Sequence, residues 1–171
     1  MDYAIQNLLV ASRSDFWTSA FLNITLLGNW KIIVVTSLVV VAIFWFWKKK
    51  EYIIPFLVVI IGGQLSGSIF KRIFARARPL NSVYHEDSFS FPSGHAIIAV
   101  VFYGFLMYFI WKNVADKFWR NTFLIIGAIV ILAIGFSRIY LGLHYFTDVL
   151  GGYILGALWL GLGIYLHKRN N

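Results

Sequence analysis

Long runs of apolar residues alternate with short polar segments along most of the chain. Five runs are apolar enough to cross a bilayer, and they cover residues 30–47, 52–70, 96–111, 122–136 and 145–166. A spanning helix takes about 17–25 residues, so the third and fourth runs reach that length only if their flanks join the helix. No run alternates with a period of two, and backbone in lipid must satisfy its own hydrogen bonds. The pattern predicts an all-α, polytopic transmembrane helix bundle with about five spans.

The first 29 residues follow a different pattern. Apolar side chains recur there at spacings of three and four, as on one face of a helix, and polar residues 12–15 interrupt them. We expect an amphipathic helix lying in the membrane interface; a sixth, poorly formed span is the alternative. We expect no cleaved signal peptide, because no basic segment precedes an apolar core and a cleavage site. Residues 1–171 are predicted to form one domain, with residues 30–166 as the bundle.

The composition indicates lipid as the solvent. Apolar residues make up 60% of the chain and charged residues 13%, against roughly 45–50% and about 25% in soluble domains. A soluble chain of this length cannot bury so much apolar surface, which argues against a cytosolic enzyme, a coiled coil or a disordered segment. Cysteine is absent, which excludes a thiol nucleophile and a disulfide. The net charge of +8 indicates either basic cytoplasmic loops or a site for an anionic ligand. Nucleic acid is not an expected partner.

The positions of the basic residues suggest an orientation in the membrane. The N-terminal segment and residues 71–95 and 137–144 fall on one side of the spans, which carries seven Lys and Arg, and the other side carries eight. Four of the seven lie in segments that we assign below to a ligand: Lys71, Arg76, Arg78 and Arg138. Without them the ratio is eight to three, so the positive-inside rule places the C-terminus in the cytoplasm and residues 71–95 outside.

Small residues recur within the spans at a spacing of four, in the pairs Gly63/Gly67 and Gly152/Gly156. This spacing lets two helices approach closely in lipid, so both pairs are predicted helix contacts. Ordinary glycine usage in membrane helices is the alternative.

Two cations stand at the end of the second span. Lys71 and Arg78 are seven residues apart, nearly two helical turns, so both side chains should leave one helix face, whereas Arg72 and Arg76 should point elsewhere. Pro79 should stop the helix, because the residue before proline avoids the α region. Cations near membrane depth are costly and usually functional, and this pair suits an anion with several oxygens. Flank cations that snorkel to the interface are the alternative.

A second polar motif, Phe91-Pro92-Ser93-Gly94-His95, directly precedes the third span. Free backbone N–H groups and the helix dipole make a helix N-terminus an anion site. Gly94 allows close approach of the backbone, Ser93 offers a hydroxyl, and His95 emerges beside them.

A third motif joins the fourth and fifth spans. Ser137 and Arg138 end one span, and His144 and Asp148 follow at a spacing of four, which predicts neighbours on one helical face. A carboxylate that accepts from one imidazole nitrogen fixes the tautomer and raises the basicity of the other nitrogen, as a nucleophilic histidine requires. Each motif alone has a plain structural explanation, but all three fall on the same side of the membrane. Together they predict one site.

In order and spacing, these motifs resemble the three signatures of the type 2 phosphatidic acid phosphatase family: Lys71-x6-Arg78-Pro79, Pro92-Ser93-Gly94-His95 and Ser137-Arg138-x5-His144-x3-Asp148. The resemblance covers about residues 50–165, and the sequence around the motifs is similar to that of small bacterial members. Many members have six spans; here the first is missing or reduced to the interfacial helix.

The resemblance implies a metal-free phosphomonoesterase or diphosphatase that acts on membrane lipids. With the orientation inferred above from the basic residues, its active site would lie at the extracytoplasmic face of the cell membrane. By that pattern His144 attacks phosphorus and forms a phosphohistidine, Asp148 orients His144, and His95 protonates the leaving oxygen and then activates water. The remaining motif residues hold the phosphoryl oxygens: Lys71, Arg78, Ser93, Gly94 and Arg138. The plausible substrates are phosphatidylglycerol phosphate, phosphatidic acid and undecaprenyl diphosphate, and the sequence does not choose among them.

Acidic residues are few. Of the seven in the chain, only Asp148 falls within the motifs, so we expect neither a metal, which would need several convergent ligands, nor another cofactor. For His85, Glu86 and Asp87 we expect a plain solvated loop rather than a contact with a head group. The alternative function is a non-catalytic binder or transporter of anionic lipids, in which the cations serve affinity only.

Overall fold

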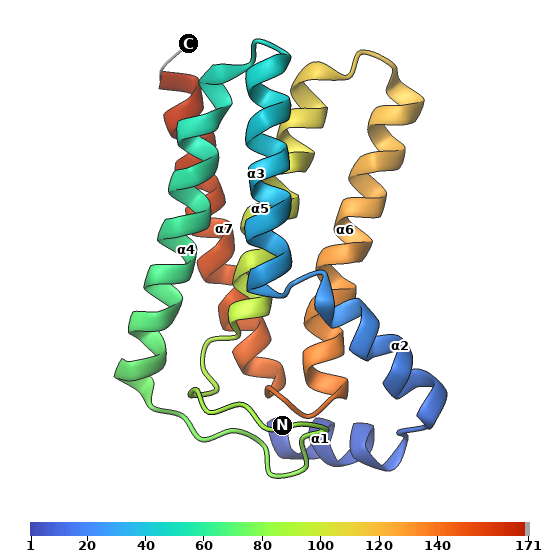
Figure 1. Ribbon diagram of the computed structural model, residues 1–171. Helices are drawn as coiled ribbons and strands as arrows, with labels where there is room; N and C mark the ends of the chain where they lie inside the picture. The colour runs from blue at the N-terminus through green and yellow to red at the C-terminus, as the bar shows by residue number, and fades with distance from the viewer. Residues whose placement is uncertain (170–171) are drawn as a thin grey trace.

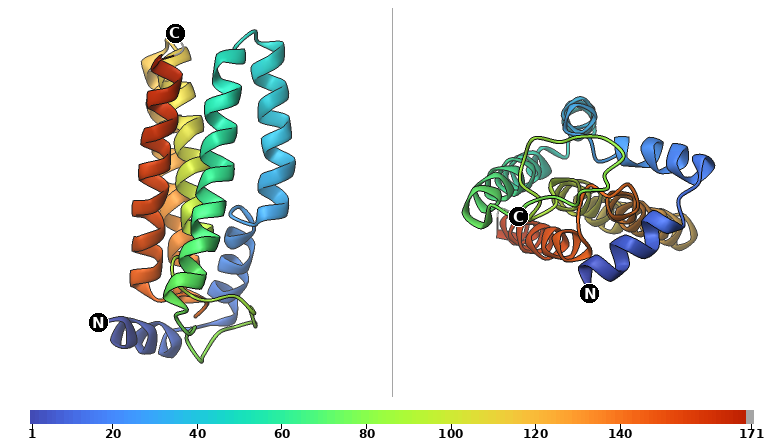
Figure 2. Two further views of the ribbon diagram at one scale, coloured as in Figure 1. Left: turned by 90° about the vertical axis from the view of Figure 1, so that its left-hand side faces the viewer. Right: turned by 90° about the horizontal axis from the view of Figure 1, so that it is seen from below.

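The structure is a computed structural model that describes residues 1–169, and within that range the chain forms helices and loops without a β-strand. Five long helices run side by side (Figure 1): α3 (Trp30–Phe46), α4 (Ile53–Phe74), α5 (Gly94–Asn113), α6 (Lys117–Tyr140) and α7 (Phe146–Arg169). A short 3-10 helix, η1 (Lys50–Tyr52), precedes α4. Two further helices, α1 (Asp2–Ala11) and α2 (Asp15–Leu26), lie at one end of the bundle, where α1 runs across it and α2 packs on α6 (Figure 2). The predicted all-α bundle is confirmed.

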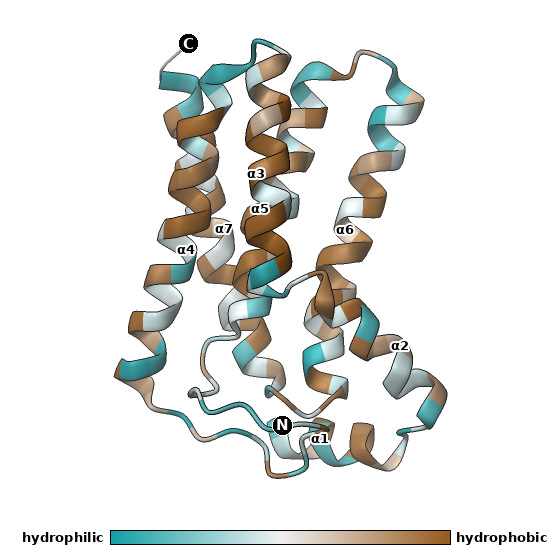
Figure 3. Cartoon of the chain, in the orientation of Figure 1, coloured by the Kyte–Doolittle hydropathy of each residue, from teal (hydrophilic) through white to brown (hydrophobic). Residues whose placement is uncertain are grey.

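The long helices agree with the expected spans. By length and hydropathy α4, α5, α6 and α7 each qualify as a membrane span, and α3 qualifies together with α2, to which it is bent by 45°. In α5 and α6 the flanking residues join the helix, as the length of a bilayer requires. Apolar residues cover the middle of the bundle and hydrophilic residues gather at its two ends (Figure 3). The chain is a multi-pass membrane protein with four or five spans.

The N-terminal segment forms two helices rather than the single one expected. α1 and α2 are separated at residues 12–14, and the side chain of Ser14 accepts a hydrogen bond from the first turn of α2, as an N-cap does. The polar residues that interrupt the apolar pattern are therefore a helix break. Phe21 of α2 packs against the rings of Phe136 and Tyr140 of α6, with centroids 5.3 and 4.6 Å apart.

Glycines let the helices approach α5, which contacts α4, α6 and α7. A Cβ atom built on Gly152 of α7 would lie 2.7 Å from the carbonyl oxygen of Ser93, and one on Gly67 of α4 would lie 2.7 Å from the side chain of Ile97. A methyl group at Gly152 would force the two helices apart, because it meets backbone, whereas one at Gly67 would displace at least the side chain of Ile97. Close contacts occur at all four glycines singled out by spacing, which confirms the predicted helix contacts: Gly63, Gly67, Gly152 and Gly156.

The polar connections separate to the two ends of the bundle as predicted. The loop of residues 75–93 and the turn of residues 141–145 lie at the end that α1 covers, and the C-terminal end of α7 lies at the opposite end (Figure 1). The predicted site residues all belong to the α1 end.

Candidate active site

The helix of the second span continues past residue 70 but ends at Phe74, before it reaches Arg78. After α4, Ala75 adopts a left-handed conformation (φ 43°, ψ 35°), and its N–H donates to the carbonyl of Lys71. Arg78 therefore lies in a loop, so the expectation that it shares a helix face with Lys71 is wrong, and the helix stops before the proline expected to end it. The cause is tertiary: the carbonyl of Arg76 accepts from Ser90 N–H across the loop at 2.8 Å, a pairing that a continued helix would prevent.

Arg78 nevertheless reaches the same place as Lys71. Its Nη1 atom lies 3.2 Å from Nε2 of His144, and its Nε atom donates to the carbonyl of Ser88 at 2.6 Å. Lys71 extends from the last turn of α4 and donates to the carbonyl of Phe89. Carbonyl groups of residues 88–89 in the loop thus hold both cations near His144.

His144 and Asp148 are in contact, although only Asp148 is helical. Nδ1 of His144 lies 3.6 Å from Oδ2 of Asp148, but α7 begins at residue 146, so the expected shared helical face is wrong. The contact arises because Asp148 sits in the first turn and folds back: the same Oδ2 accepts from the backbone N–H of Tyr145 at 2.8 Å, in the manner of a capping box. The hydroxyl of Ser90 also donates to Oδ2. Both members of the pair are buried.

Within the described part of the chain, the start of α5 presents an unpaired hydroxyl group with open space beside it. Ser93 is fully buried, and its Oγ atom has no hydrogen-bond partner among residues 1–169. A Cβ atom added to Gly94 would meet open space, with nothing within 4 Å. The backbone N–H of Ser93 donates to the carbonyl of Asp148 at 3.0 Å, which ties this helix start to α7. His95 follows in the first turn, where the charges of Arg138, Arg78 and Lys71 act on its imidazole.

Arg138 is buried at the end of α6 and joins three elements. Its Nη1 atom donates to the hydroxyl of Thr25 on α2 at 3.0 Å and to that of Tyr84 in the loop at 2.7 Å. Its Nη2 atom pairs with Glu86. Its Nε atom is buried without a partner in the part of the chain that the structure describes. One N–H of a buried guanidinium is therefore left to bind an oxygen.

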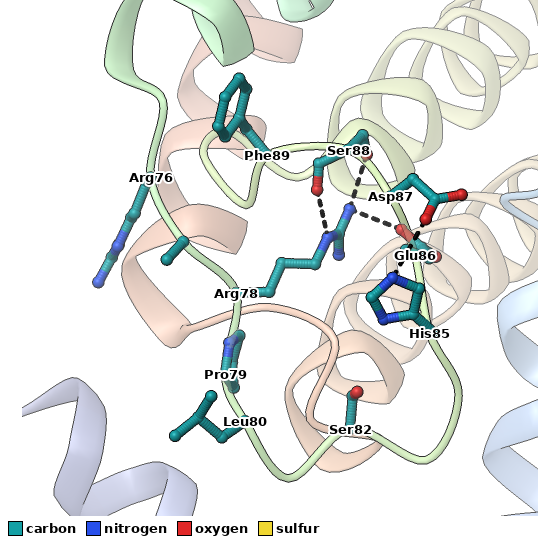
Figure 4. A pocket seen from close by; sticks show the side chains of 11 residues that line it. Arg76, Arg78, Pro79, Leu80, Ser82, His85, Glu86, Asp87, Ser88 and Phe89 are labelled. Carbon is teal, nitrogen blue, oxygen red and sulfur yellow. Dashed lines mark hydrogen bonds and ion pairs between the residues drawn. The ribbon is translucent and has the colours of Figure 1, made fainter.

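Glu86 is not the solvated loop residue that we expected. Its Oε2 atom lies 2.6 Å from Nη2 of Arg78, and its Oε1 atom pairs with Arg138. Burial alone would raise the pKa of Glu86, but Arg138 and Arg78 outweigh it and hold that pKa below its usual range. Arg78 and Glu86 are among the residues of the 76–89 segment that line an open pocket of about 410 Å³ (Figure 4). His85 and Asp87 pair with each other at 3.1 Å and are exposed, as expected.

Arg76 also departs from its expected position. It was expected to point away, but its Nη1 atom lies 2.6 Å from Oδ1 of Asp148. Like the contacts of Ser90, Tyr84 and Thr25, this one joins segments far apart in the chain, and no spacing rule identifies it. The only signal for Arg76 was its place within the cation run between the second span and the proline.

The electrostatics of the site favour a neutral histidine. Burial lowers the pKa of His144 to about 3, and Arg138, Arg78 and Lys71 act in the same direction, while the bond to Asp148 opposes them. His144 is therefore uncharged at neutral pH. With its Nδ1 atom directed at the carboxylate, its Nε2 lone pair is directed toward Arg78.

The described residues offer donors for an anion rather than ligands for a metal. Within residues 1–169, no group of three or more His, Asp or Glu side chains is placed to hold a metal ion. The guanidinium groups of Arg78 and Arg138 and the ammonium group of Lys71 lie near His144 instead, and this donor set matches an oxyanion such as a phosphoryl group.

Comparison with known proteins shows that this chain is similar to membrane phosphatases. Residues 52–171 match the family model described as the PAP2 superfamily. Phosphatidylglycerophosphatase B of Bacillus subtilis (strain 168) is 34% identical over 160 residues, which cover 92% of this chain and 78% of that protein. A putative undecaprenyl-diphosphatase of Escherichia coli (strain K12), YbjG, is 26% identical over 155 residues, covering 81% and 73% of the two chains. The crystal structure of a transmembrane PAP2 type phosphatidylglycerolphosphate phosphatase from Bacillus subtilis superposes with a TM-score of 0.91 at 31% identity, over 99% of this chain and 86% of that one.

Proposed function

This chain belongs to the PAP2 superfamily of membrane phosphatases, and we propose that it releases phosphate from a membrane lipid through a phosphohistidine on His144. The contact chain from Asp148 through His144 to Arg78 carries the proposal. The carboxylate holds Nδ1, burial keeps the imidazole neutral, and Nε2 faces a phosphate-binding cation. These are the requirements of a nitrogen nucleophile.

The phosphoryl oxygens are bound by the donors that converge around Nε2. In this proposal the cations are Lys71, Arg78 and Arg138, and the start of α5 contributes the Ser93 hydroxyl and the Gly94 N–H. The unpaired Ser93 Oγ and Arg138 Nε atoms and the open space at Gly94 support this assignment. Each hydrogen bond to a charged group contributes roughly 1.5–3 kcal/mol, and phosphoryl transfer is catalysed mainly by such positioning and charge stabilisation.

His95 serves as acid and then as base. When Nε2 of His144 attacks, a P–N bond forms and the P–O bond to the lipid breaks, and His95 gives its proton to the leaving oxygen. His95 then accepts a proton from water, whose oxygen attacks phosphorus and breaks the P–N bond, and inorganic phosphate leaves. The position of His95 one residue beyond Gly94 supports this role.

The substrate is a lipid mono- or diphosphate whose chains remain in the bilayer. The names of the relatives support phosphatidylglycerol phosphate and undecaprenyl diphosphate in particular, with phosphatidic acid as a third substrate to test. We further propose that residues 1–171 act as one domain with the site at the extracytoplasmic face and the C-terminus in the cytoplasm. The excess of Lys and Arg at the opposite end, once site residues are set aside, supports this orientation.

The test is phosphate release by purified protein from a panel of these three lipids in detergent, with and without a strong chelator. We expect turnover of at least one lipid, unchanged by the chelator, and no turnover by His144→Ala although the variant stays folded. The alternative, a lipid binder, predicts that the wild type binds the same lipids and releases no phosphate.

A further inference from the structure

The N-terminal helix α1 is bonded to the first turn of α7 through Asp2. The Oδ1 atom of Asp2 accepts from the backbone N–H of Thr147 at 3.2 Å, and its Oδ2 atom accepts from the hydroxyl of the same residue. The first N–H groups of a helix have no partner within the helix, and a carboxylate there also complements the helix dipole. Asp2 thereby caps the helix that carries Asp148, from a segment more than 140 positions away in the chain.

Arg76 joins this cap to the catalytic carboxylate. Its Nη2 atom lies 2.7 Å from Oδ2 of Asp2, and its Nη1 atom lies 2.6 Å from Oδ1 of Asp148. Its guanidinium also stands over the ring of Tyr145 at 4.3 Å, and the ring of Tyr3 in α1 packs edge-on against the same ring at 5.5 Å. The residue next to His144 is thus held between α1 and Arg76.

The two oxygens of Asp148 have separate partners. Oδ2 faces His144, Ser90 and the backbone of Tyr145, whereas Oδ1 pairs with Arg76. A carboxylate held at one oxygen only can rotate about its terminal bond. Because Arg76 holds the other oxygen, the plane of the carboxylate is fixed, and so is the direction in which it draws Nδ1 of His144.

We propose that Arg76 and Asp2 are positioning residues of the phosphatase reaction: Asp2 orients Arg76, and Arg76 fixes the Asp148 carboxylate that aims His144 at phosphorus. Neither residue is a signature residue of the three motifs, although Arg76 falls between Lys71 and Arg78, and α1 acquires a role in the reaction. The inference rests on the proposed function of His144. Both Nη atoms of Arg76 are already paired with protein oxygens, so its action on the substrate is indirect.

The test compares Arg76→Met, Arg76→Lys and Asp2→Asn with matched controls, using phosphatidylglycerol phosphate in detergent micelles. The controls are Arg72→Met, on the exposed end of α4, and Asp15→Asn, at the exposed start of α2. Small misplacements of a catalytic group cost up to about 100-fold in rate, so we expect Arg76→Met to lower kcat about tenfold or more. KM and inhibition by inorganic phosphate should stay within about twofold, because the phosphate-binding cations are intact. The controls should match the wild type.

A double-mutant cycle separates positioning from general destabilisation. Asp2→Asn should lower kcat about threefold in the wild type and have no further effect in Arg76→Met, since coupled residues are not additive. Arg76→Lys keeps a cation for Asp148, so its kcat should lie between that of Arg76→Met and that of the wild type. Adding Asp2→Asn to Arg76→Lys should lower kcat no further. If Arg76→Met does not fold, Asp2→Asn and Arg76→Lys decide by the same criteria.

The inference is overturned if kcat stays within twofold of the wild type in Asp2→Asn and Arg76→Lys, if KM alone rises, or if the two substitutions act additively. His144→Asn in the same assay tests the underlying function. An inactive His144→Asn beside fully active Asp2 and Arg76 variants would remove this inference alone, whereas an active His144→Asn would remove the proposed nucleophile.

Discussion

Glu86 places its Oε2 atom 2.6 Å from Nη2 of Arg78, and its second carboxylate oxygen pairs with Arg138. One carboxylate thus uses both oxygens to neutralise two of the cations that we assign to the phosphoryl group. The Arg78 guanidinium also bonds Ser88, and Lys71 bonds Phe89. A phosphate that enters must compete with this loop for the same donors.

Replacing Glu86 by Gln should therefore strengthen the binding of phosphate. The amide keeps the size of the side chain but removes the charge that competes for the two arginines. A charge-assisted hydrogen bond is worth roughly 1.5–3 kcal/mol, so we expect inhibition constants of inorganic phosphate and vanadate to fall by about tenfold. Asp87→Asn is the matched control, because that residue is exposed in the same loop. Weaker inhibition in Glu86→Gln would show that the carboxylate organises the arginines instead of competing with phosphate.

Protonation of His144 should destabilise the protein in mild acid. Burial lowers its pKa from 6.5 to about 3 in the folded state, so below pH 6.5 the unfolded chain binds a proton that the folded chain does not. The stability contributed by the neutral imidazole is complete above pH 6.5 and declines as the pH falls toward 3, by at most about 1.4 kcal/mol per pH unit.

His144→Asn should remove this part of the pH dependence. Between pH 6.5 and 5, the melting temperature in detergent should fall less in the variant than in the wild type. Above pH 6.5 the difference in melting temperature between the two proteins should be constant. Parallel melting curves across the whole range would mean that the native imidazole titrates normally.

The spans, and the end of the bundle at which the three motifs gather, were predictable from the sequence because they depend on local signals. Hydrophobic runs fix where helices lie in lipid, and the spacing of four at Gly152 and Gly156 indicated a close contact that the packing on α5 confirms. Lys71 and His144 were predicted to lie at the same end of the bundle from their positions relative to the spans. Their roles remain proposals.

The geometry of the site was not predictable in the same way. Helical periodicity placed Arg78 on α4 and His144 on α7, and both lie in loops. In each case long-range bonds override local propensity: the Ser90–Arg76 backbone pair stops α4, and the fold-back of the Asp148 carboxylate, rather than a shared helix face, creates its contact with His144. Contacts of this kind have no period along the chain.

His95→Asn should trap the phosphorylated enzyme when the substrate is a lipid diphosphate. The leaving group is then the lipid monophosphate, which departs without the proton that an alkoxide requires, so the first step persists. The second step needs His95 to activate water, and it should become rate-limiting. Label from undecaprenyl diphosphate that carries ³²P in its terminal phosphate should accumulate on the protein as an acid-labile, alkali-stable adduct. The label should be absent when His144 is also replaced by Asn; an adduct that survives in this double variant would place the phosphoryl group on another residue.

Gly152→Ala should weaken both the fold and the reaction, because of where this glycine meets α5. A methyl group there would stand 2.7 Å from the carbonyl oxygen of Ser93 and 2.8 Å from the Cβ atom of Ala96, so α5 must move away from α7. Overpacking of this kind costs about 1–3 kcal/mol, and the movement would carry Ser93 and Gly94 away from His144.

Gly161→Ala in the same helix is the matched control: nothing lies within 4 Å of its added methyl group, and removal of a helical glycine should stabilise by roughly 0.5–1 kcal/mol. We expect Gly152→Ala to lower the melting temperature and kcat together, and Gly161→Ala to raise the melting temperature slightly at unchanged kcat. Equal melting temperatures and rates for the two variants would mean that α5 and α7 are not held at this separation in the membrane.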